Sequence, residues 1–305
     1  MSEELRYDGK VAIITGAGGG LGRSHALLLA SRGAKVVVND LGGSVDGSGD
    51  GSLSPADKVV AEIKEAGGEA VADGNTVSTQ EGGKAIVQTA LDNYGRVDII
   101  INNAGILRDK SFRNMSPEFL NPVLDVHLQG SFWTTQAAWE TMREQKFGRI
   151  INTSSAAGIF GNFGQTNYGA AKAGIVGLTN VLAIEGAKYN IKANVLAPGA
   201  KTRMTEDLMA AMAGGDIDMS PEQVSPIVAF LAHEDCPVSG EIYSAAAGRV
   251  GRIFIAACVG YFDKDLTVEK IRDNFEQIRN EEGYQVPGNA TEEMGLMMQA
   301  MNAAK

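Results

Sequence analysis

Cysteine and histidine are both scarce in this sequence. Among its 305 residues there are two cysteines and three histidines. Two cysteines, Cys236 and Cys258, are too few for a disulfide framework or a thiolate metal site, so no metal is predicted. Unpaired cysteines fit the reducing environment of the cytoplasm, which is the predicted compartment.

The sequence also lacks long apolar runs and a surplus of basic residues. No apolar run reaches the roughly 18 residues that a membrane span requires, and no charged start precedes an apolar signal segment. With 37 acidic and 27 basic residues, the formal net charge is −10. A negative chain is a poor ligand for nucleic acid or an anionic membrane, so we expect a small-molecule partner instead.

Apolar residues are plentiful, at 44% of the chain, and their arrangement predicts an α/β fold. From residue 11 to about residue 200, short strand-like segments alternate with helix-like ones. Such alternation predicts a doubly wound parallel sheet with helices on both faces. We expect one domain over residues 1–250 and a helical extension over 251–305, packed on the same domain or at a subunit interface. In that extension, residues 267–282 and 294–301 are predicted to be helical.

A glycine-rich turn joins the first predicted strand, residues 10–14, to a helix-like run, residues 23–31. Glycines there let the backbone approach a pyrophosphate, whose charge the N–H groups and dipole of a helix start favour. The spacing differs from the G-x-G-x-x-G fingerprint but serves the same mechanics, although tight turns use glycine for many reasons. The residues predicted to contact the cofactor here are Gly16, Gly20, Leu21 and Gly22.

Asp40 follows the second predicted strand, residues 34–38, at the position where an acid binds the adenosine ribose of a dinucleotide. A carboxylate there repels the 2′-phosphate of NADP, and the next residues offer no cation to bind it. Arg23 is the nearby cation, and a solvated surface residue is an equally good interpretation of it. The predicted cofactor is therefore NAD.

Two further turns follow apolar strand-like segments, residues 97–101 and 193–197. Open parallel sheets bind ligands at the carboxyl ends of their strands, although an ordinary turn explains either segment equally well. Asn102, for example, could serve mainly to tie the sheet together. The residues predicted to contact the cofactor at these turns are Asn103, Ala104, Gly105, Pro198 and Gly199.

The candidate catalytic residues are Ser155, Tyr168 and Lys172. If Tyr168 and Lys172 lie on a helix, they share one face one turn apart. A phenol with a pKa of about 10 is a poor base at neutral pH, and a neighbouring ammonium would lower that pKa. The Ser155 hydroxyl would polarise the same substrate oxygen. Tyr-x-x-x-Lys alone could be a chance pair on a solvated face.

Taken in order, these motifs resemble the short-chain dehydrogenase/reductase family over roughly residues 8 to 250. The resemblance implies a single-domain Rossmann-like fold and a Ser155-Tyr168-Lys172 catalytic set that oxidises a secondary alcohol with NAD. It also implies that Tyr168 and Lys172 contact the cofactor, and that the protein forms a homodimer or a homotetramer.

Two positions depart from the family pattern. His127 stands where the family usually has a catalytic Asn. It could take over the proton relay through a ring nitrogen bonded to a backbone carbonyl or a water, although a lone helical histidine is more often structural. Asn75 stands where many members have an Asp that contacts adenine, and its amide could make the same contact.

Within the family, residues 39–53, 103–109 and 161–165 resemble the dehydrogenase units of peroxisomal multifunctional β-oxidation enzymes, of the 17β-hydroxysteroid dehydrogenase type 4 kind. This resemblance implies oxidation of (3R)-3-hydroxyacyl-CoA to 3-ketoacyl-CoA in the degradation of fatty or steroid side chains. The chain departs from these enzymes in having no length for their other parts and in ending Asn302-Ala303-Ala304-Lys305 instead of Ser-Lys-Leu. A 17β-hydroxysteroid dehydrogenase acting on free steroid is the alternative. A regulatory NAD-binding protein without turnover is the third hypothesis, disfavoured by the complete Ser-Tyr-Lys set.

Three other segments bear on the substrate. Residues 42–54, rich in glycine and serine, are predicted to be a surface loop. Residues 202–219 fall where the family has its substrate-covering loop, and their methionines suit a large apolar group, although a core stripe at helical spacing is a strong alternative. A CoA moiety needs cations for its phosphates, and the candidates are Arg108, Lys110, Arg113, Lys201 and Arg203.

Overall fold

The computed structural model describes residues 3–48, 54–202 and 217–303 of the chain. By its internal contacts the chain divides into two compact units, Met1–Arg252 and Ile253–Lys305. Among the described residues, no helix is long and apolar enough to cross a bilayer. The expected packing of the extension on the main domain or at a subunit interface stays a prediction.

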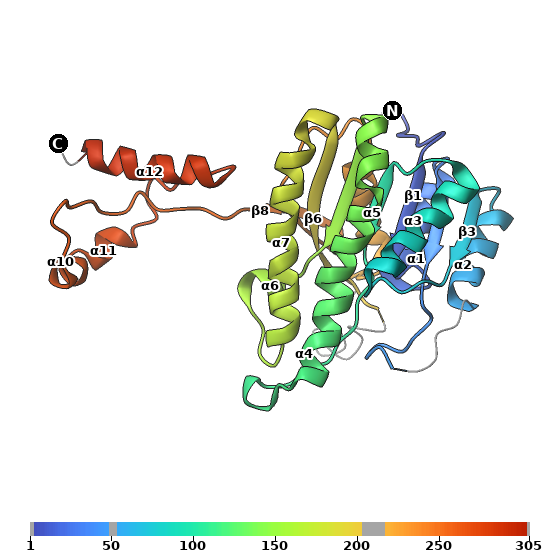
Figure 1. Cartoon of the computed structure of the whole chain (residues 1–305), viewed down its shortest axis with the longest axis horizontal. Helices are drawn as coiled ribbons and strands as arrows, with labels where there is room; N and C mark the ends of the chain where they lie inside the picture. Colours follow the sequence, from blue (N-terminus) through green and yellow to red (C-terminus); the bar gives the residue numbers. More distant parts are fainter. Residues whose placement is uncertain (1–2, 49–53, 203–216, 304–305) are drawn as a thin grey trace. The chain divides into compact units, whose positions relative to one another are not determined.

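The first unit is built on one eight-stranded sheet with strand order β3-β2-β1-β4-β5-β6-β7-β8 (Figure 1). Every pair from β3 to β7 is parallel. This confirms the predicted doubly wound Rossmann-like sheet. The strands are β1 (Val11–Thr15), β2 (Lys35–Asn39), β3 (Glu69–Asp73), β4 (Ile99–Asn102), β5 (Gly148–Thr153), β6 (Ile191–Gly199), β7 (Ile242–Ala246) and β8 (Arg249–Ile253).

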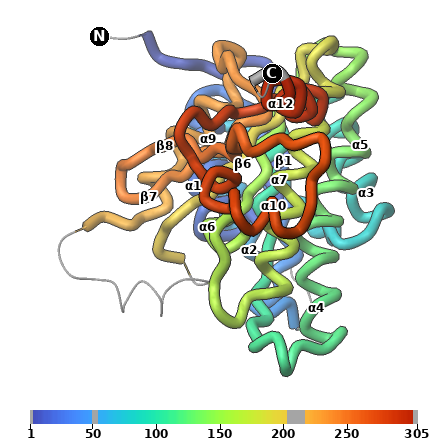
Figure 2. The backbone as a smooth tube through the Cα atoms, turned by 90° about the vertical axis from the view of Figure 1, so that its left-hand side faces the viewer, coloured from blue at the N-terminus to red at the C-terminus, as the bar shows by residue number. Residues whose placement is uncertain are grey.

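Helices cover both faces of this sheet, so its central strands are buried on both sides. Figure 2 shows α3 and α5 on one side of the strands and α1 and α9 on the other. All five residues of β1 are buried, which explains its continuous apolar run. The helical segments of this unit are α1 (Gly20–Ser31), α2 (Ser54–Glu65), α3 (Gln80–Tyr94), η1 (Phe112–Asn114), α4 (Pro117–Leu124), η2 (Asp125–Gln129), α5 (Gly130–Gln145), α6 (Ala156–Phe160), α7 (Thr166–Gly186), η3 (Ala187–Tyr189), η4 (Pro221–Gln223) and α9 (Ser225–Ala232).

Two apolar clusters hold the layers together. In one, Leu29 of α1, Ile63 of α2 and Leu231 of α9 pack with residues of the first strands. In the other, Ile86 of α3 and Met142 of α5 pack against the opposite face of the same strands. Successive residues of each central strand therefore point into different clusters, as the alternation of side chains along a strand requires.

The strand order reverses between β1 and β4, because β2 and β3 lie on one side of β1 while β4 to β7 lie on the other. The connections after β1 and β4 consequently leave the sheet in opposite directions. A crevice forms at such a point, outside the carboxyl ends of the strands. The fold thus places the residues after β1, β2 and β4 around one site.

The second unit contains α10 (Val268–Asp273), α11 (Phe275–Ile278) and α12 (Ala290–Ala303). The prediction of one helix over residues 267–282 is wrong, because the helical segment is interrupted at Asn274. There the side-chain amide donates to the Lys270 carbonyl at 2.8 Å, and the backbone leaves the helical region at φ −111° and ψ 16°. The predicted helix over residues 294–301 is confirmed and begins earlier, at Ala290.

Candidate active site

The glycine turn between β1 and α1 packs directly against the segment after β4. Gly16 has φ +63°, and a Cβ there would lie 2.8 Å from the Ala104 Cα. At Gly22 a Cβ would lie 2.3 Å from the Gly16 carbonyl oxygen. These two positions need glycine because backbone approaches backbone there. Gly20, at φ +52°, opens the helix and faces the crevice.

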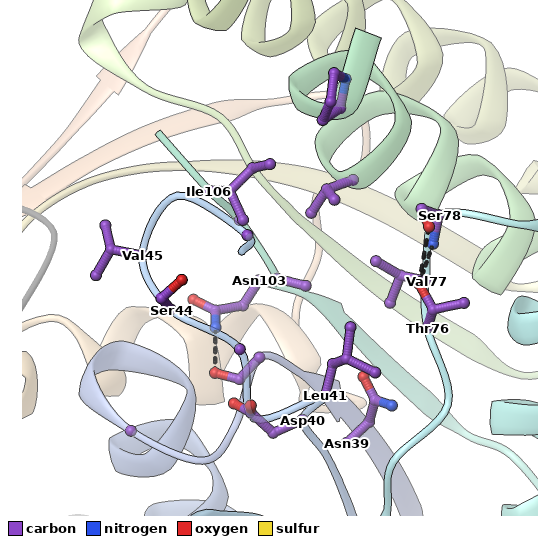
Figure 3. Close-up of a pocket in the computed structure, with 18 of the residues that line it drawn as sticks. Asn39, Asp40, Leu41, Ser44, Val45, Thr76, Val77, Ser78, Asn103 and Ile106 are labelled. Atoms are coloured by element: carbon purple, nitrogen blue, oxygen red, sulfur yellow. Dashed lines mark hydrogen bonds between the residues drawn. The ribbon is translucent and has the colours of Figure 1, made fainter. Parts of the chain in front are cut away.

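A cavity of about 400 Å³ lies at this crevice, with the residues after β1, β2, β3 and β4 around it (Figure 3). The predicted cofactor residues that line it are Gly16, Gly20, Leu21, Asp40, Asn75, Asn103, Ala104 and Gly105. Gly22 does not line the cavity and instead packs against the Gly16 carbonyl within the turn. Pro198 and Gly199 lie at the carboxyl end of β6, outside the lining of this cavity.

Asp40 is anchored in the cavity wall by backbone N–H groups. Its Oδ2 accepts from Gly18 N at 2.8 Å and its Oδ1 from Gly42 N at 2.7 Å. Its charge is thereby held beside the glycine turn, where it disfavours a further phosphate. Arg23 does not offset this charge, because its guanidinium pairs with Glu62 of α2.

The segment after β4 is tied to β1 by side-chain hydrogen bonds. Asn103 Nδ2 donates to the carbonyls of Thr15 and Gly16 at 3.0 and 3.1 Å. The Thr15 hydroxyl accepts from the backbone of Asn103 and Ala104. Asn102 is buried and donates to Asn152 Oδ1 at 2.8 Å, so it joins β4 to β5 rather than facing the cavity.

Asn75 is an exposed residue hydrogen-bonded to two buried polar residues, Asp73 and Asn39, at the ends of β3 and β2. Its side-chain amide donates to Asp73 Oδ2 at 2.8 Å, and its carbonyl accepts from Asn39 Nδ2 at 2.8 Å. The Nδ2 group is thus turned toward Asp73. The side-chain oxygen of Asn75 is then the group suited to an adenine amino group.

Tyr168 and Lys172 lie on α7, as the spacing predicted, with Lys172 Nζ 5.5 Å from the centroid of the Tyr168 ring. Lys172 is buried, and its Nζ donates to the Thr153 carbonyl at the end of β5 at 2.5 Å. Burial lowers the pKa of Lys172 to about 7, because a buried ammonium loses its hydration. Near neutral pH this side chain is therefore close to its titration midpoint.

Ser155 caps the N-terminus of α6, next to Tyr168. Burial raises the pKa of Tyr168, the hydrogen bond with Ser155 lowers it, and the charge of Asp109 raises it. The expected lowering of the Tyr168 pKa toward neutrality is therefore wrong for the chain itself. The physical reason is that the burial of the phenol outweighs the hydrogen bond, while Lys172 is itself easily deprotonated.

His127 lies in the π-helical turn η2 and is buried beside Tyr168, with ring centroids 5.1 Å apart. Its Nε2 is 2.8 Å from the Ile106 carbonyl oxygen and 3.1 Å from the Ile106 amide nitrogen. Burial first, and then the charge of Lys172, hold the pKa of His127 well below its usual value. The contact with a backbone carbonyl is one of the contacts expected for the His127 ring. Because the lowered pKa keeps the ring neutral, uptake of a proton by the ring is unfavourable.

Asn167 is a residue that sequence reasoning missed. It is fully buried, and its Nδ2 donates to the carbonyls of Arg108 and Phe119, both at 2.8 Å. Its Oδ1 accepts from the backbone N–H of Tyr168 at 2.8 Å. The first turn of α7 is thus joined to the segment after β4 and to α4. A polar residue directly before Tyr168 was the available signal.

Residues 42–48 form a surface loop, as predicted, and several of them also line the cavity, which the sequence did not indicate. They include Ser44 and Val45, both seen in Figure 3. Arg108, predicted to bind CoA, lines the same cavity and donates to the carbonyls of Asp46 and Glu118. The methionine-rich stretch proposed to cover the substrate, and Arg203 with it, lie mostly outside the described residues.

Comparisons with known proteins agree with this arrangement. The model of the short chain dehydrogenase family matches residues 10–213. A peroxisomal multifunctional enzyme type 2 of Mus musculus is 48% identical over 99% of this chain, which covers 41% of that protein. A hydroxyacyl-CoA dehydrogenase of Mycobacterium tuberculosis is 41% identical over 77% of this chain and 76% of its own length. The crystal structure of a short chain dehydrogenase from Mycobacterium avium matches with a TM-score of 0.78 and 42% identity, over 90% of this chain and 97% of that one.

The chain therefore belongs to the short chain dehydrogenase family and is an oxidoreductase. Its relatives include peroxisomal multifunctional enzymes of type 2, which confirms the narrower resemblance of its motifs. Members of the family generally use NAD or NADP. The chain spans less than half the length of the mouse relative.

Proposed function

We propose that this protein oxidises a (3R)-3-hydroxyacyl-CoA to the 3-ketoacyl-CoA with NAD as the acceptor. The main support for the proposal is that Ser155, Tyr168 and Lys172 lie close together at the carboxyl edge of the sheet, next to a cavity that contains Asp40. The names of the mouse and Mycobacterium tuberculosis relatives support the dehydrogenase activity and the acyl-CoA substrate class.

The residues of the cavity fit a dinucleotide. The glycine turn has no side chains that would fill the approach to a pyrophosphate, and Gly16 and Gly20 adopt the positive φ angles that the turn requires. Asp40 would hold the adenosine ribose, and Asn75 would contact the adenine. Bound NAD would supply the hydride acceptor.

The fixed carboxylate of Asp40 supports NAD over NADP. Its two oxygens are held by backbone N–H groups, so it cannot turn away from a 2′-phosphate. The nearby guanidinium of Arg23 is already paired with Glu62. A single change, Asp40→Ala, should therefore weaken NAD binding and narrow the difference in affinity between NAD and NADP.

In the proposed reaction Ser155 and Tyr168 hold the hydroxyl oxygen of the substrate. Tyr168 takes the hydroxyl proton while the hydride leaves the carbinol carbon, so the alcohol becomes a ketone and one proton is released to water. Lys172 would bond the nicotinamide ribose and stabilise the phenolate when it is protonated. His127 would keep the segment after β4 in place through Ile106.

Exposed apolar side chains on two long helices support the proposal that the protein forms a homodimer or a homotetramer. Val181 and Ile184 of α7 are 51% and 57% exposed, and Phe132 of α5 is 42% exposed. Apolar residues in such positions are typical of subunit contacts. The cytoplasmic location is proposed from the two free cysteines.

The test is NADH formation by the purified protein, offered NAD with (3R)- and (3S)-3-hydroxyacyl-CoA of several lengths and, separately, a 17β-hydroxysteroid. We expect turnover of the (3R) thioester, reduced about 10²- to 10⁴-fold by Tyr168→Phe. Activity confined to the free steroid would replace the proposal with the second hypothesis. Cofactor binding without any turnover would support a regulatory protein.

A further inference from the structure

The inference concerns how the chain retains its cofactor, and it begins with residues 42–48, called here the 42–48 loop. Gly43, Ser44, Val45 and Gly47 of this loop line the cavity beside Asp40. Figure 3 shows Ser44 and Val45 on the opposite side of the cavity from Thr76, Val77 and Ser78. The 42–48 loop is therefore one wall of the cavity that would hold the adenosine part of the cofactor.

The 42–48 loop has an ordered structure of its own. Asp46 Oδ1 accepts from the Ser44 hydroxyl at 2.5 Å and from the Ser48 amide and hydroxyl at 2.9 and 2.7 Å. The Ser44 amide donates to the Ser48 carbonyl at 3.1 Å. These hydrogen bonds hold the pKa of Asp46 well below its usual value.

This closed loop is attached to the rest of the site through residues 106–108, which follow the turn after β4. The Leu107 amide donates to the Val45 carbonyl at 3.0 Å. Arg108 Nε donates to the Asp46 carbonyl at 2.7 Å. Gly47, at φ +75°, lies against Ile106, since a Cβ there would be 3.1 Å from the Ile106 Cδ1.

The Arg108 side chain also connects the 42–48 loop to α4. Its Nη1 donates to the Glu118 carbonyl on α4 at 2.8 Å, so one guanidinium joins the 42–48 loop to a helix. The planar guanidinium presents its N–H groups to two carbonyls in fixed directions, whereas the ammonium of a lysine is a compact group on a flexible stem. Two of its N–H groups are thereby committed to the backbone.

We propose that Arg108 is a positioning residue for the dinucleotide: by tying the 42–48 loop to α4, it keeps one wall of the cavity closed and slows the release of the cofactor. The inference rests on the proposed NAD function and adds a determinant of affinity to it. Arg108 does not touch Ser155, Tyr168 or Lys172 in any contact of the described residues, so the chemical step should not depend on it.

The experiment measures NADH binding to the full chain without any alcohol, by fluorescence titration and stopped-flow release. In Arg108→Met, which keeps the apolar stem and loses every N–H donor, we expect the Kd for NADH to rise about tenfold through faster release. The Kd for NADH of Arg108→Lys should lie between those of Arg108→Met and the unaltered protein. Arg272→Met, which removes an exposed ion pair with Asp273, should bind NADH as the unaltered protein does.

A second variant tests the attachment between the 42–48 loop and residues 106–108 by a change in the loop. Gly47→Ala places a methyl group against Ile106 in a backbone conformation that alanine disfavours, so it should also raise the Kd for NADH. If both changes weaken the same attachment, the Kd for NADH of the double variant should rise by less than the product of the increases in the two single variants. Thermal melting of each variant would show that the folded state is kept.

Unchanged NADH affinity and release in Arg108→Met and Gly47→Ala would overturn the inference. A fall in kcat with unchanged NADH affinity would also overturn it, since Arg108 would then act on the catalytic side. Failure of the proposed function has a different signature, because the unaltered protein would then bind no NADH or would bind it without turnover.

Discussion

At the scale of single residues, burial shifts the pKa values of the candidate catalytic groups away from those of the free side chains. Tyr168 has the phenol expected of a base, but its burial raises its pKa. Lys172 has the expected ammonium, but its burial lowers its pKa to about 7. Each side chain is therefore shifted toward its neutral form, and the protonation of the pair depends strongly on pH near and above neutrality.

The pH dependence of turnover follows from these shifts. A raised Tyr168 pKa leaves the phenol protonated at neutral pH, so alcohol oxidation, which needs the phenolate, should rise as the pH rises, and ketone reduction should be favoured as it falls. Loss of the Lys172 proton should add an inflection near pH 7 at which this rise is reduced, because the neutral amine no longer stabilises the phenolate. The measurement is kcat/KM for oxidation over a range of pH, with Lys172→Met as the comparison that should lack the lower inflection. A flat profile would contradict this prediction.

Asn167 is predicted to hold Tyr168 in position. In Asn167→Ala, the carbonyls of Arg108 and Phe119 lose a buried donor, which should cost about 1–3 kcal/mol of unfolding free energy. Because the first turn of α7 then loses its hydrogen bonds to Arg108 and to Phe119 of α4, kcat should fall more than the affinity for NADH. Asn167→Asp keeps the acceptor for the Tyr168 amide and should retain more activity. Equal kcat in the alanine variant and the unaltered protein would rule out the positioning role.

At the scale of elements, helices and strands with a strong apolar pattern were predictable and irregular segments were not. The predicted strand at residues 10–14 became β1, displaced by one residue, because five consecutive buried positions suit a central parallel strand. The loop after β2 was predicted, but its role in the cavity was not, because its glycines and serines indicate only a turn. Its place in the cavity wall comes from hydrogen bonds to residues 106–108, far away in the sequence.

The outer faces of α5 and α7 are predicted to form a subunit contact. Val181 and Ile184 are more than half exposed on α7, and a charge at both should disrupt such a contact. We expect Val181→Glu/Ile184→Glu to reduce the oligomer to monomers in light scattering after gel filtration. Val268→Glu, at a site 79% exposed in the second unit, is the matched control. A monomeric unaltered protein would refute the prediction directly.

At the scale of the whole molecule, all residues of the cavity and the Ser-Tyr-Lys set lie in the first unit, Met1–Arg252. A chain ending at Ala256, which keeps β8 complete, should therefore bind NADH with unchanged affinity. The measurement is the same fluorescence titration used for the full chain. Weaker binding by a chain that still folds would show that the second unit supports the cofactor site.

The sequence by itself determined the fold class and the identity of the chemical groups. Buried parallel strands require continuous apolar runs, and the glycine turn, Asp40 and the Tyr168-Lys172 spacing are local patterns that can be identified without coordinates. What only the tertiary structure decided are properties that arise between distant segments: the direction of each pKa shift, the partner of His127, and the roles of Asn167 and Arg108. Burial and hydrogen bonds set these properties, and both depend on which segments the fold brings together.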